Sequence, residues 1–132
     1  MNMDYKIIEI PKVEDYRGNL AIIEKEVLPY TFKRVYYLYD VPSTAHRGGH
    51  AHKQHQEFLV AISGSFDVVL DTGTERTTIT LNKPDKGLFI PTNMWRELEN
   101  FSSGAVCLVL ASHEFEESDY IREYDEFLAW IK

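Results

Sequence analysis

The chain alternates between short segments rich in β-branched and aromatic residues and turns built from glycine, proline, asparagine, aspartate or serine. No helical pattern separates these segments, which disfavours an α/β fold with helices between parallel strands. Short strands at this spacing are typical of an antiparallel barrel or sandwich. The segments expected as strands are residues 5–11, 20–27, 32–41, the histidine-containing stretch up to residue 64, 65–71, 76–81, 87–91 and 105–111.

The last fifteen residues differ from this pattern. Apolar and aromatic side chains recur there at helical spacing, namely Tyr120, Ile121, Tyr124, Phe127, Leu128 and Ile131. Ser118 is a candidate N-cap, and Asp119 suits the positive end of a helix. We therefore expect one amphipathic helix that lies on the barrel and uses its aromatic stripe for packing. No repeat or linker interrupts the chain, which predicts a single domain over residues 1–132.

Charge and composition narrow the range of functions. The net charge of −7 argues against nucleic-acid binding, which needs clustered lysine and arginine. No apolar run approaches the ~20 residues that cross a bilayer, and the first residues lack the layout of a secretion signal. The single cysteine, Cys107, excludes an internal disulfide, is expected in the core and fits a reducing cytoplasm. A local basic pocket for one phosphorylated small molecule remains compatible with the acidic total.

Two histidines carry the strongest chemical signal. His50 and His52 are two residues apart, so their side chains share one face of an extended strand, and Glu57 follows five residues later. Two imidazoles and a carboxylate can hold a divalent metal. Alternatively, the imidazoles can act as acid and base near neutral pH, or can simply satisfy hydrogen bonds inside the barrel.

The spacing around these histidines resembles the first motif of the cupins, a family of small β-barrels. The matching pattern is His50-x-His52, four residues, Glu57, six residues, Gly64. This resemblance implies an all-β, jelly-roll type antiparallel barrel, to which the C-terminal helix is added.

The second cupin motif is only partly present. Pro91 and Asn100 are in register, but Asn93 replaces the usual glycine and Arg96 replaces the usual histidine. In metal-binding cupins that histidine is the fourth protein ligand. Arginine is not a ligand and brings a permanent positive charge, which repels a cation and attracts a diphosphate or enolate. We therefore expect no metal and no cofactor.

A second resemblance covers nearly the whole chain. The sequence is similar to the sugar 3,4-ketoisomerases that act on dTDP-4-oxo-6-deoxy-D-glucose. It implies a metal-independent isomerase that makes a dTDP-3-oxo-6-deoxyhexose for a later aminotransferase in deoxyamino-sugar synthesis, and a homodimer with exchanged N-terminal strands. The segments that carry the resemblance are Arg17-Gly18, Lys33 to Tyr37, Arg47 to Lys53, Trp95, Phe101 to Ser103, Leu110 to Ser112 and Ser118 to Phe127.

Moving a carbonyl from C4 to C3 requires a base and an acid, together with donors around the enediolate oxygens. We assign His52 to carry the proton between the two carbons and His50 to be its acid/base partner, although the order can be reversed. Tyr37 is a candidate donor to the oxyanion, or else a packing residue. Its neighbour Tyr36 should face the other side of the strand.

The remaining candidates are contacts to the substrate. Arginine forks match phosphate oxygens in a bidentate way, a glycine turn lets a ligand approach the backbone, and tryptophan can stack on thymine or wall the sugar pocket. The expected substrate-binding residues are Arg17, Gly18, Arg34, Arg47, Lys53, Trp95 and Arg96. The pair Arg17-Gly18 favours a product of galacto configuration.

Three other functions remain open. A sugar-nucleotide 3,5-epimerase would also enolise beside a C4 ketone but would keep the ketone there. A metal-dependent cupin oxygenase would use His50, His52 and Glu57 as ligands. A binding module without turnover would use the same pocket. His55 is expected to be structural because it lies on the opposite strand parity from His52.

Overall fold

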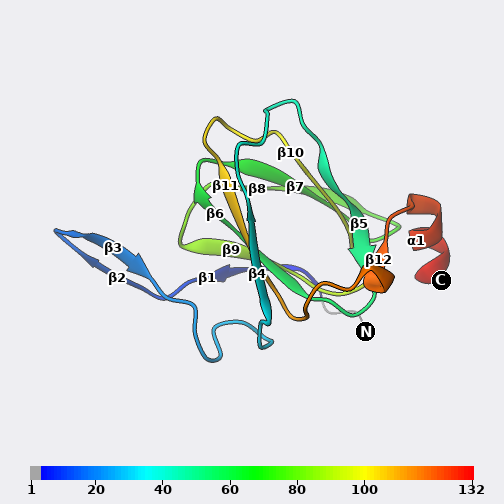
Figure 1. Ribbon diagram of the computed structural model, residues 1–132, viewed down its shortest axis with the longest axis horizontal. Coiled ribbons are helices and arrows are strands. Elements are labelled where there is room, and N and C mark those ends of the chain that lie inside the picture. The colour runs from blue at the N-terminus through cyan, green and yellow to red at the C-terminus, as the bar shows by residue number, and fades with distance from the viewer. Residues whose placement is uncertain (1–3) are drawn as a thin grey trace.

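The computed structural model describes residues 4–132, which form two five-stranded antiparallel sheets and a separate two-stranded hairpin (Figure 1). The first sheet has the order β1 (Lys6–Glu9), β9 (Lys86–Ile90), β6 (Glu57–Ser63), β11 (Val106–Ala111) and β4 (Arg34–Leu38). The second has the order β12 (Tyr120–Ile121), β5 (Arg47–His52), β10 (Trp95–Glu99), β7 (Phe66–Asp71) and β8 (Arg76–Leu81). The expected all-β antiparallel architecture is confirmed. Strand β10 was not among the expected strands.

The hairpin β7–β8 illustrates how local sequence sets the register. Asp71 pairs with Arg76 across the turn, and Gly73 adopts a φ of 97°, which a side chain rarely tolerates. The Asp71 carboxylate accepts a hydrogen bond of 2.7 Å from the Gly73 amide. These features confirm the hairpin expected between residues 65–71 and 76–81.

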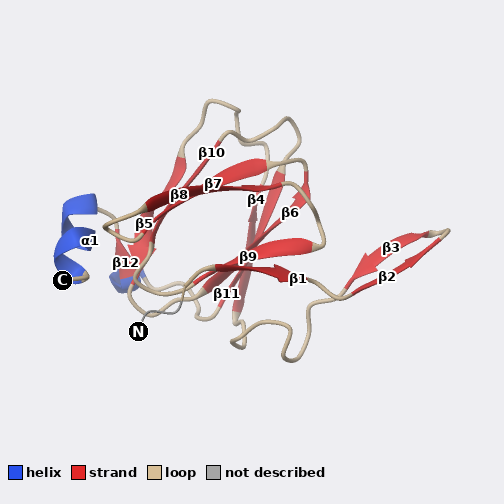
Figure 2. Ribbon diagram, turned by 180° about the vertical axis from the view of Figure 1, so that it is seen from behind, coloured by secondary structure: helices blue, strands red, loops and turns tan. Residues whose placement is uncertain are grey.

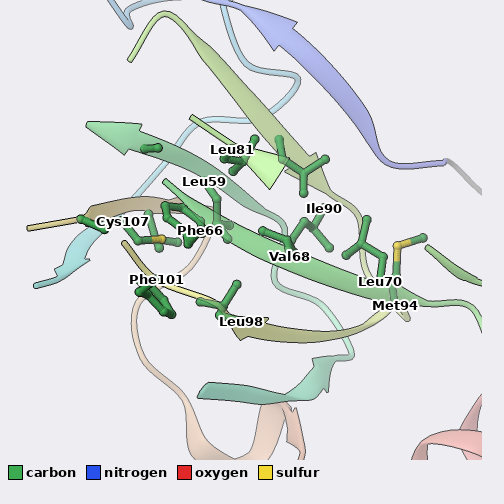
Figure 3. Close-up of a cluster of buried hydrophobic side chains, with 14 residues drawn as sticks. Leu59, Phe66, Val68, Leu70, Leu81, Ile90, Met94, Leu98, Phe101 and Cys107 are labelled. Carbon is green, nitrogen blue, oxygen red and sulfur yellow. The ribbon is translucent and has the colours of Figure 1, made fainter. Parts of the chain in front are cut away.

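The main apolar core lies between the two sheets (Figure 3). Phe66 from β7 and Phe101 stack with ring centroids 5.2 Å apart, and both side chains are fully buried. Cys107 of β11 lies in the same cluster, and burial raises the pKa of its thiol. The expectation that Cys107 is a core residue is confirmed. Alternate residues of the inner strands face this core, and toward one end of the sandwich polar side chains take over the same inward positions, as Glu57 does next to Leu59 on β6 and Arg96 next to Leu98 on β10.

The C-terminal segment departs from its expected form. A short 3₁₀ turn at Glu117–Asp119 and strand β12 precede helix α1, which begins only at Tyr124 and ends at Trp130. Tyr120 and Ile121 pair with β5 instead of continuing a helix. The expected helix start at Ser118 is therefore wrong, because sheet pairing outweighs the helical spacing there. The helix itself is confirmed, and its Phe127 is fully buried.

The N-terminal hairpin is built from β2 (Lys12–Asp15) and β3 (Gly18–Ala21) and extends away from the sandwich (Figures 1 and 2). All eight strand residues are exposed. The strand expected over residues 20–27 ends at Ala21, and Lys25 adopts a positive φ of 51°, which is incompatible with an extended strand. Within the described residues, no helix is long and apolar enough to cross a membrane.

Candidate active site

A cavity of about 290 Å³ opens between the two sheets at the polar end of the sandwich. Four arginines contribute to its wall, whereas Glu57 is the one carboxylate among its lining residues. The basic pocket that the sequence allowed on an acidic protein is therefore present. The lining residues are Arg34, Tyr36, Leu38, Arg47, Gly48, His50, Glu57, Leu59, Arg96, Leu98, Val109, Tyr120 and Arg122.

The two histidines of β5 meet at the base of this cavity. Their Nε2 atoms lie 3.2 Å apart, and the rings are nearly perpendicular. His50 lines the cavity, whereas His52 is completely buried behind it. The expectation that both imidazoles face one side is confirmed. Of the two, His50 is the side chain that lines the cavity.

Asp119 completes the polar chain behind the histidines. Its Oδ2 atom lies 3.0 Å from Nδ1 of His52, and the residue is 6% exposed. The same carboxylate accepts hydrogen bonds from the backbone amides of Gln54 at 2.7 Å and His55 at 3.2 Å. Sequence reasoning had assigned Asp119 to a helix terminus. Asp119 directly precedes the strand β12, which pairs with the strand that carries His52. This pairing, which the sequence analysis did not recognise, is what places the carboxylate beside the histidine.

A second set of hydrogen-bonded side chains in the cavity wall links Glu57 of β6 to Arg96 of β10 and Tyr36 of β4. Glu57 accepts hydrogen bonds of 2.8 Å from both the Arg96 guanidinium and the Tyr36 hydroxyl. Arg96 is 2% exposed, and its NH2 group also donates to the carbonyl of Met94 at 3.1 Å. Among the described residues, nothing accepts the Nε–H of Arg96. The Nε–H itself is enclosed by protein, whereas the guanidinium as a whole brings its positive charge to the cavity wall.

Burial and positive neighbours set the charge state of the histidines. Desolvation and the charge of Arg96 lower the pKa of His50 to about 3. The same two causes lower the pKa of His52, with additional effects from His50 and His55. Both imidazoles are therefore neutral near pH 7 in the free protein. Burial, together with the charge of Glu57, raises the pKa of the Tyr36 phenol.

The cupin resemblance raises the question of whether these residues fit a metal ion. Ligand atoms of His50, His52 and Glu57 lie within 4.8 Å of one another, close enough for a shared ion. However, Glu57 is already paired with the Arg96 cation, and Arg96 occupies the position of the fourth ligand. Nδ1 of His52 is also engaged by Asp119. A divalent cation would therefore sit beside a fixed positive charge, and the donor set does not fit one.

The structure corrects the assignment of the tyrosine. Side chains alternate along β4, with Tyr36 directed into the cavity and Tyr37 directed outward, where it is 60% exposed. The opposite facing of the two side chains was expected, but not which of them is inside. Tyr36, with its hydroxyl on Glu57, is therefore the tyrosine of β4 that lines the cavity.

The same alternation removes Trp95 from the site. On β10, Arg96 faces the cavity, so Trp95 faces the opposite side and packs against Tyr124 and Phe127 of helix α1. Trp95 is 5% exposed and belongs to this second core. Lys53 also lies outside the cavity, with its ammonium group 5.1 Å from the ring centroid of Trp130. Neither residue reaches a ligand in this cavity.

The remaining expected contacts divide by position. Arg34 and Arg47 line the cavity, as expected of ligand contacts. Arg17 and Gly18 lie instead at the tip of the β2–β3 hairpin, where Arg17 forms an exposed ion pair of 2.7 Å with Asp15. Gly18 has a φ of 126°, which fits its position at a tight turn. Within one chain, therefore, the hairpin tip contributes nothing to the cavity.

Two lining residues of the C-terminal segment were missed by sequence reasoning. The ring of Tyr120 lies 4.9 Å from the centroid of His50 and 4.5 Å from that of His52. The guanidinium of Arg122 lies 4.1 Å from the Tyr120 ring centroid and pairs with Glu117 at 2.7 Å. The helical spacing of this segment had suggested packing only. Its pairing with β5 is what brings both residues to the cavity.

The deviation from the second cupin motif has a structural explanation. Asn93 adopts a φ of 61°, the left-handed conformation for which glycine is most often used. Asparagine is enriched in this conformation among non-glycine residues. The turn before β10 is therefore preserved, and it delivers Arg96 to the place where the motif has histidine.

Comparison with known proteins agrees with this geometry. The family model described as FdtA: WxcM-like, C-terminal matches residues 3–132. A curated relative, the TDP-4-oxo-6-deoxy-alpha-D-glucose-3,4-oxoisomerase of Aneurinibacillus thermoaerophilus, is 44% identical over 130 residues, which cover 98% of this chain and 94% of the relative.

Two solved structures extend the comparison to three dimensions. A 3,4-ketoisomerase mutant from Thermoanaerobacterium thermosaccharolyticum, in complex with TDP-4-keto-6-deoxyglucose, is 36% identical with a TM-score of 0.95 and coverage of 99% of this chain and 96% of that one. The TDP-quinovose 3,4-ketoisomerase from Campylobacter jejuni is 46% identical with a TM-score of 0.91 and coverage of 95% and 97%. The cupin-type fold is confirmed, and this chain belongs to the FdtA, WxcM-like C-terminal family.

Proposed function

We propose that this protein is an isomerase that moves the carbonyl of dTDP-4-oxo-6-deoxy-α-D-glucose from C4 to C3 through an enediolate. The observation that carries the proposal is the pair of neutral imidazoles at the base of a cavity with four arginines. A neutral imidazole is able to remove a proton, and positive walls favour both a diphosphate and an enediolate. The names of the relatives with 44% and 36% identity support this substrate.

The substrate has two negatively charged or electron-rich parts, and the cavity has groups suited to both. Arg34, Arg47 and Arg122 are exposed or half-buried at the cavity wall and suit the diphosphate. Arg96 is deeply buried beside Glu57, and its positive charge at the cavity wall suits a sugar oxygen that gains negative charge. We therefore assign Arg96 to the enediolate and the outer arginines to the diphosphate.

The chemical step needs one movable proton on carbon. His50 removes the proton from C3, and the electrons of the broken C–H bond form the C3–C4 double bond while O4 takes up negative charge. The O3–H bond then breaks as its proton passes to O4 and its electrons form the C3=O3 carbonyl, while the electrons of the C3–C4 double bond take up a proton at C4 from His50. Every atom of the substrate is retained. Arg96 stabilises the charge that develops on oxygen, and it is already in place before the charge appears.

Product analysis tests the proposed function. The protein is incubated with dTDP-4-oxo-6-deoxyglucose in D₂O, and ¹³C and ¹H NMR follow the carbonyl and the ring protons. We expect the carbonyl to move from C4 to C3, with deuterium entering the ring. An unchanged authentic substrate would reject the proposal. A product with an inverted centre and its ketone still at C4 would identify an epimerase instead, and activity lost on chelation would identify a metal enzyme.

A parallel incubation in H₂O, in which C4 carries a hydrogen, reports the configuration at C4. We propose the galacto product, a preference that rests on Arg17 and Gly18. The hydrogen at C4 is then equatorial and couples weakly to the axial hydrogen at C5. A strong coupling would instead identify the gluco product, which is the configuration of quinovose, the sugar in the name of the Campylobacter jejuni relative.

We further propose a cytoplasmic homodimer in which each chain lends its β2–β3 hairpin to the other. An isolated two-stranded hairpin is marginally stable in water, yet this one exposes Val13 by 52% and Leu20 by 60%. Strand β4 is a free sheet edge whose outer face exposes Tyr37 by 60% and Tyr39 by 62%. A hairpin on that edge would bury both apolar surfaces and bring Arg17 toward the partner. Sedimentation analysis tests this, and a monomer at micromolar concentration would contradict it.

A further inference from the structure

The carboxylate of Asp119 is fixed more rigidly than a merely structural residue at a turn requires. Its Oδ1 atom accepts the amide of Gln54, and its Oδ2 atom accepts the amide of His55 and faces Nδ1 of His52. The backbone carbonyl of Asp119 accepts the amide of Lys53 at 3.1 Å. The residue is thus held to the end of β5 by three backbone hydrogen bonds. Oδ2 also lies 3.0 Å from Nδ1 of His52 and 3.6 Å from Nε2 of His55.

This contact determines where the proton of His52 resides. The amides of Gln54 and His55 donate to the carboxylate, so its oxygens act as acceptors, and Nδ1 of His52 has to supply a proton at 3.0 Å. Neutral imidazole carries a single N–H, so Nε2 of His52 retains a lone pair. That lone pair points toward Nε2 of His50.

A parallel contact acts on His50. Its Nδ1 atom faces the carbonyl oxygen of Gly48, which only accepts, so the proton of neutral His50 also resides on Nδ1. Both Nε2 atoms then carry lone pairs that face each other across 3.2 Å. This separation is within the range of a hydrogen bond, so a proton placed between the two nitrogen atoms would join them by an N–H···N hydrogen bond. The pair makes three polar contacts: His50 with the Gly48 carbonyl, His52 with Asp119, and the two Nε2 atoms with each other. The two protons of the neutral rings serve the first two contacts, and one additional proton between the Nε2 atoms would complete the third.

We propose that Asp119 is a positioning residue that keeps the proton of His52 on Nδ1 and thereby leaves Nε2 free to share, with Nε2 of His50, the proton removed from the sugar. The inference rests on the proposed isomerase function. In this step the C3–H bond breaks and an N–H bond forms at His50 Nε2, hydrogen-bonded to His52 Nε2. The pair then delivers this proton, or a solvent deuteron that has exchanged for it, to C4. The positive charge of the pair is balanced by the enediolate while the proton is held.

The other charged and titratable groups around the pair are compatible with this role. Glu57 lies 3.7 Å from Nε2 of His52 and is paired with Arg96, so its charge is largely balanced. Arg96 opposes an added proton until the enediolate is present, which limits protonation of the pair from solvent. The groups that face the pair from neighbouring elements are Arg34 and Tyr36 of β4, His55 and Glu57, Arg96 of β10, and Glu117, Asp119, Tyr120 and Arg122 of the C-terminal segment.

The first test reads the tautomers directly in the free wild-type protein. Long-range ¹H–¹⁵N correlation spectra at pH 7 distinguish a ring whose proton is on Nδ1 from one whose proton is on Nε2. We expect both His50 and His52 to carry their proton on Nδ1. A His52 ring protonated on Nε2 would overturn the proposal. This measurement requires no substrate and no variant, so it stands even if the isomerase activity is not found.

The second test measures turnover in Asp119→Asn, which keeps the side-chain size and removes the charge. We expect kcat to fall about 10- to 100-fold, by analogy with the loss of carboxylates that orient metal-bound histidines, with KM nearly unchanged because Asp119 does not line the cavity. The matched control is Glu116→Gln, which removes a carboxylate charge from an exposed neighbour and should keep wild-type kcat. Wild-type kcat in Asp119→Asn, or a loss confined to KM, would overturn the proposal. If the variant does not fold, the wild-type spectra decide.

Discussion

The C-terminal segment (residues 117–130) and the β2–β3 hairpin (residues 12–21) extend from opposite ends of the sandwich (Figure 1). Both are short, and both mix aromatic, aliphatic and charged residues. The C-terminal segment pairs with β5, buries Phe127 completely and directs Asp119 at His52. The hairpin exposes all eight of its strand residues and pairs Arg17 with Asp15 in solvent.

The difference teaches that the contacts of a segment, and not its composition, decide what its residues contribute. An exposed ion pair such as Arg17–Asp15 contributes little to stability, because water and salt screen it. The contact between Asp119 and His52 is buried, with side chains 6% and 0% exposed, and fixes a ring nitrogen. In the same way, Phe127 is buried and stabilises the folded chain, whereas Val13 and Leu20 are exposed and bury little apolar surface within one chain. The following predictions test this contrast.

The largest effect is expected at the histidine that the C-terminal segment serves. His50→Asn removes the imidazole that lines the cavity, and loss of a general acid–base group lowers kcat by about 10²- to 10⁴-fold. At about 1.4 kcal/mol per tenfold, this corresponds to about 3–5 kcal/mol of transition-state stabilisation. The control is His46→Asn, because His46 is exposed and pairs with Glu97 outside the cavity. Equal turnover by both variants, measured by NMR of the product, would refute the role of His50.

The next effect contrasts two aromatic residues, one from each region. Phe127→Ala should destabilise the protein by about 3–5 kcal/mol, because it leaves a cavity under helix α1. Tyr16→Ala at the hairpin tip, where Tyr16 is 98% exposed, should change stability by less than about 0.5 kcal/mol. Urea unfolding followed by tryptophan fluorescence measures both. A similar free energy of unfolding for the two variants would remove the distinction between the regions.

A smaller effect appears in the pH dependence of stability. The pKa of His50 is lowered to about 3 from an ordinary value of 6.5, so the unfolded chain binds a proton more readily than the folded one. The contribution of neutral His50 is fully present above pH 6.5 and is lost as the pH falls toward 3. Urea unfolding between pH 7 and pH 4 should therefore give a steeper loss for wild type than for His50→Asn. Identical slopes would contradict the burial of a neutral imidazole.

Substitutions in the β2–β3 hairpin are expected to have the smallest effect on the stability of the single chain. They are expected to have the largest effect on formation of the proposed dimer. The double variant Val13→Ser, Leu20→Ser changes two exposed positions, so each should alter single-chain stability by less than about 0.5 kcal/mol. The proposed dimer should nevertheless dissociate at concentrations at which wild type remains associated, as sedimentation velocity would show. The pair Thr77→Ser, Thr78→Ser on β8 provides an exposed control. An unchanged dimer in the hairpin variant would show that the exposed apolar surface is not the interface.

Local sequence pattern was sufficient for much of the fold and part of the site. The β7–β8 hairpin follows from alternation and a glycine turn, and the shared face of His50 and His52 follows from their spacing of two residues. The alternation also implied that Tyr36 and Tyr37 face opposite ways. It could not tell which of them is inside, because that depends on the side of β4 that packs against the other sheet.

Other features depend on contacts between residues that are far apart in the chain. Asp119 is 67 residues from His52, and no local pattern reveals that pairing. The helical spacing of Tyr120 and Ile121 even suggested a different element, because their sheet pairing with β5 is decided by a strand about 70 residues earlier.

The sequence by itself determined the strand pattern, the facing pair of imidazoles and the substitution of Arg96 for a metal-binding histidine, because each of these depends on spacing and residue type alone. Only the tertiary structure decided that His50 fronts the cavity, that Tyr36 replaces Tyr37, that Trp95 packs under the helix and that Asp119 holds His52. The physical reason is that burial and hydrogen-bond partners are properties of the assembled sheets. A side chain acquires them only when strands that are distant in sequence come into register.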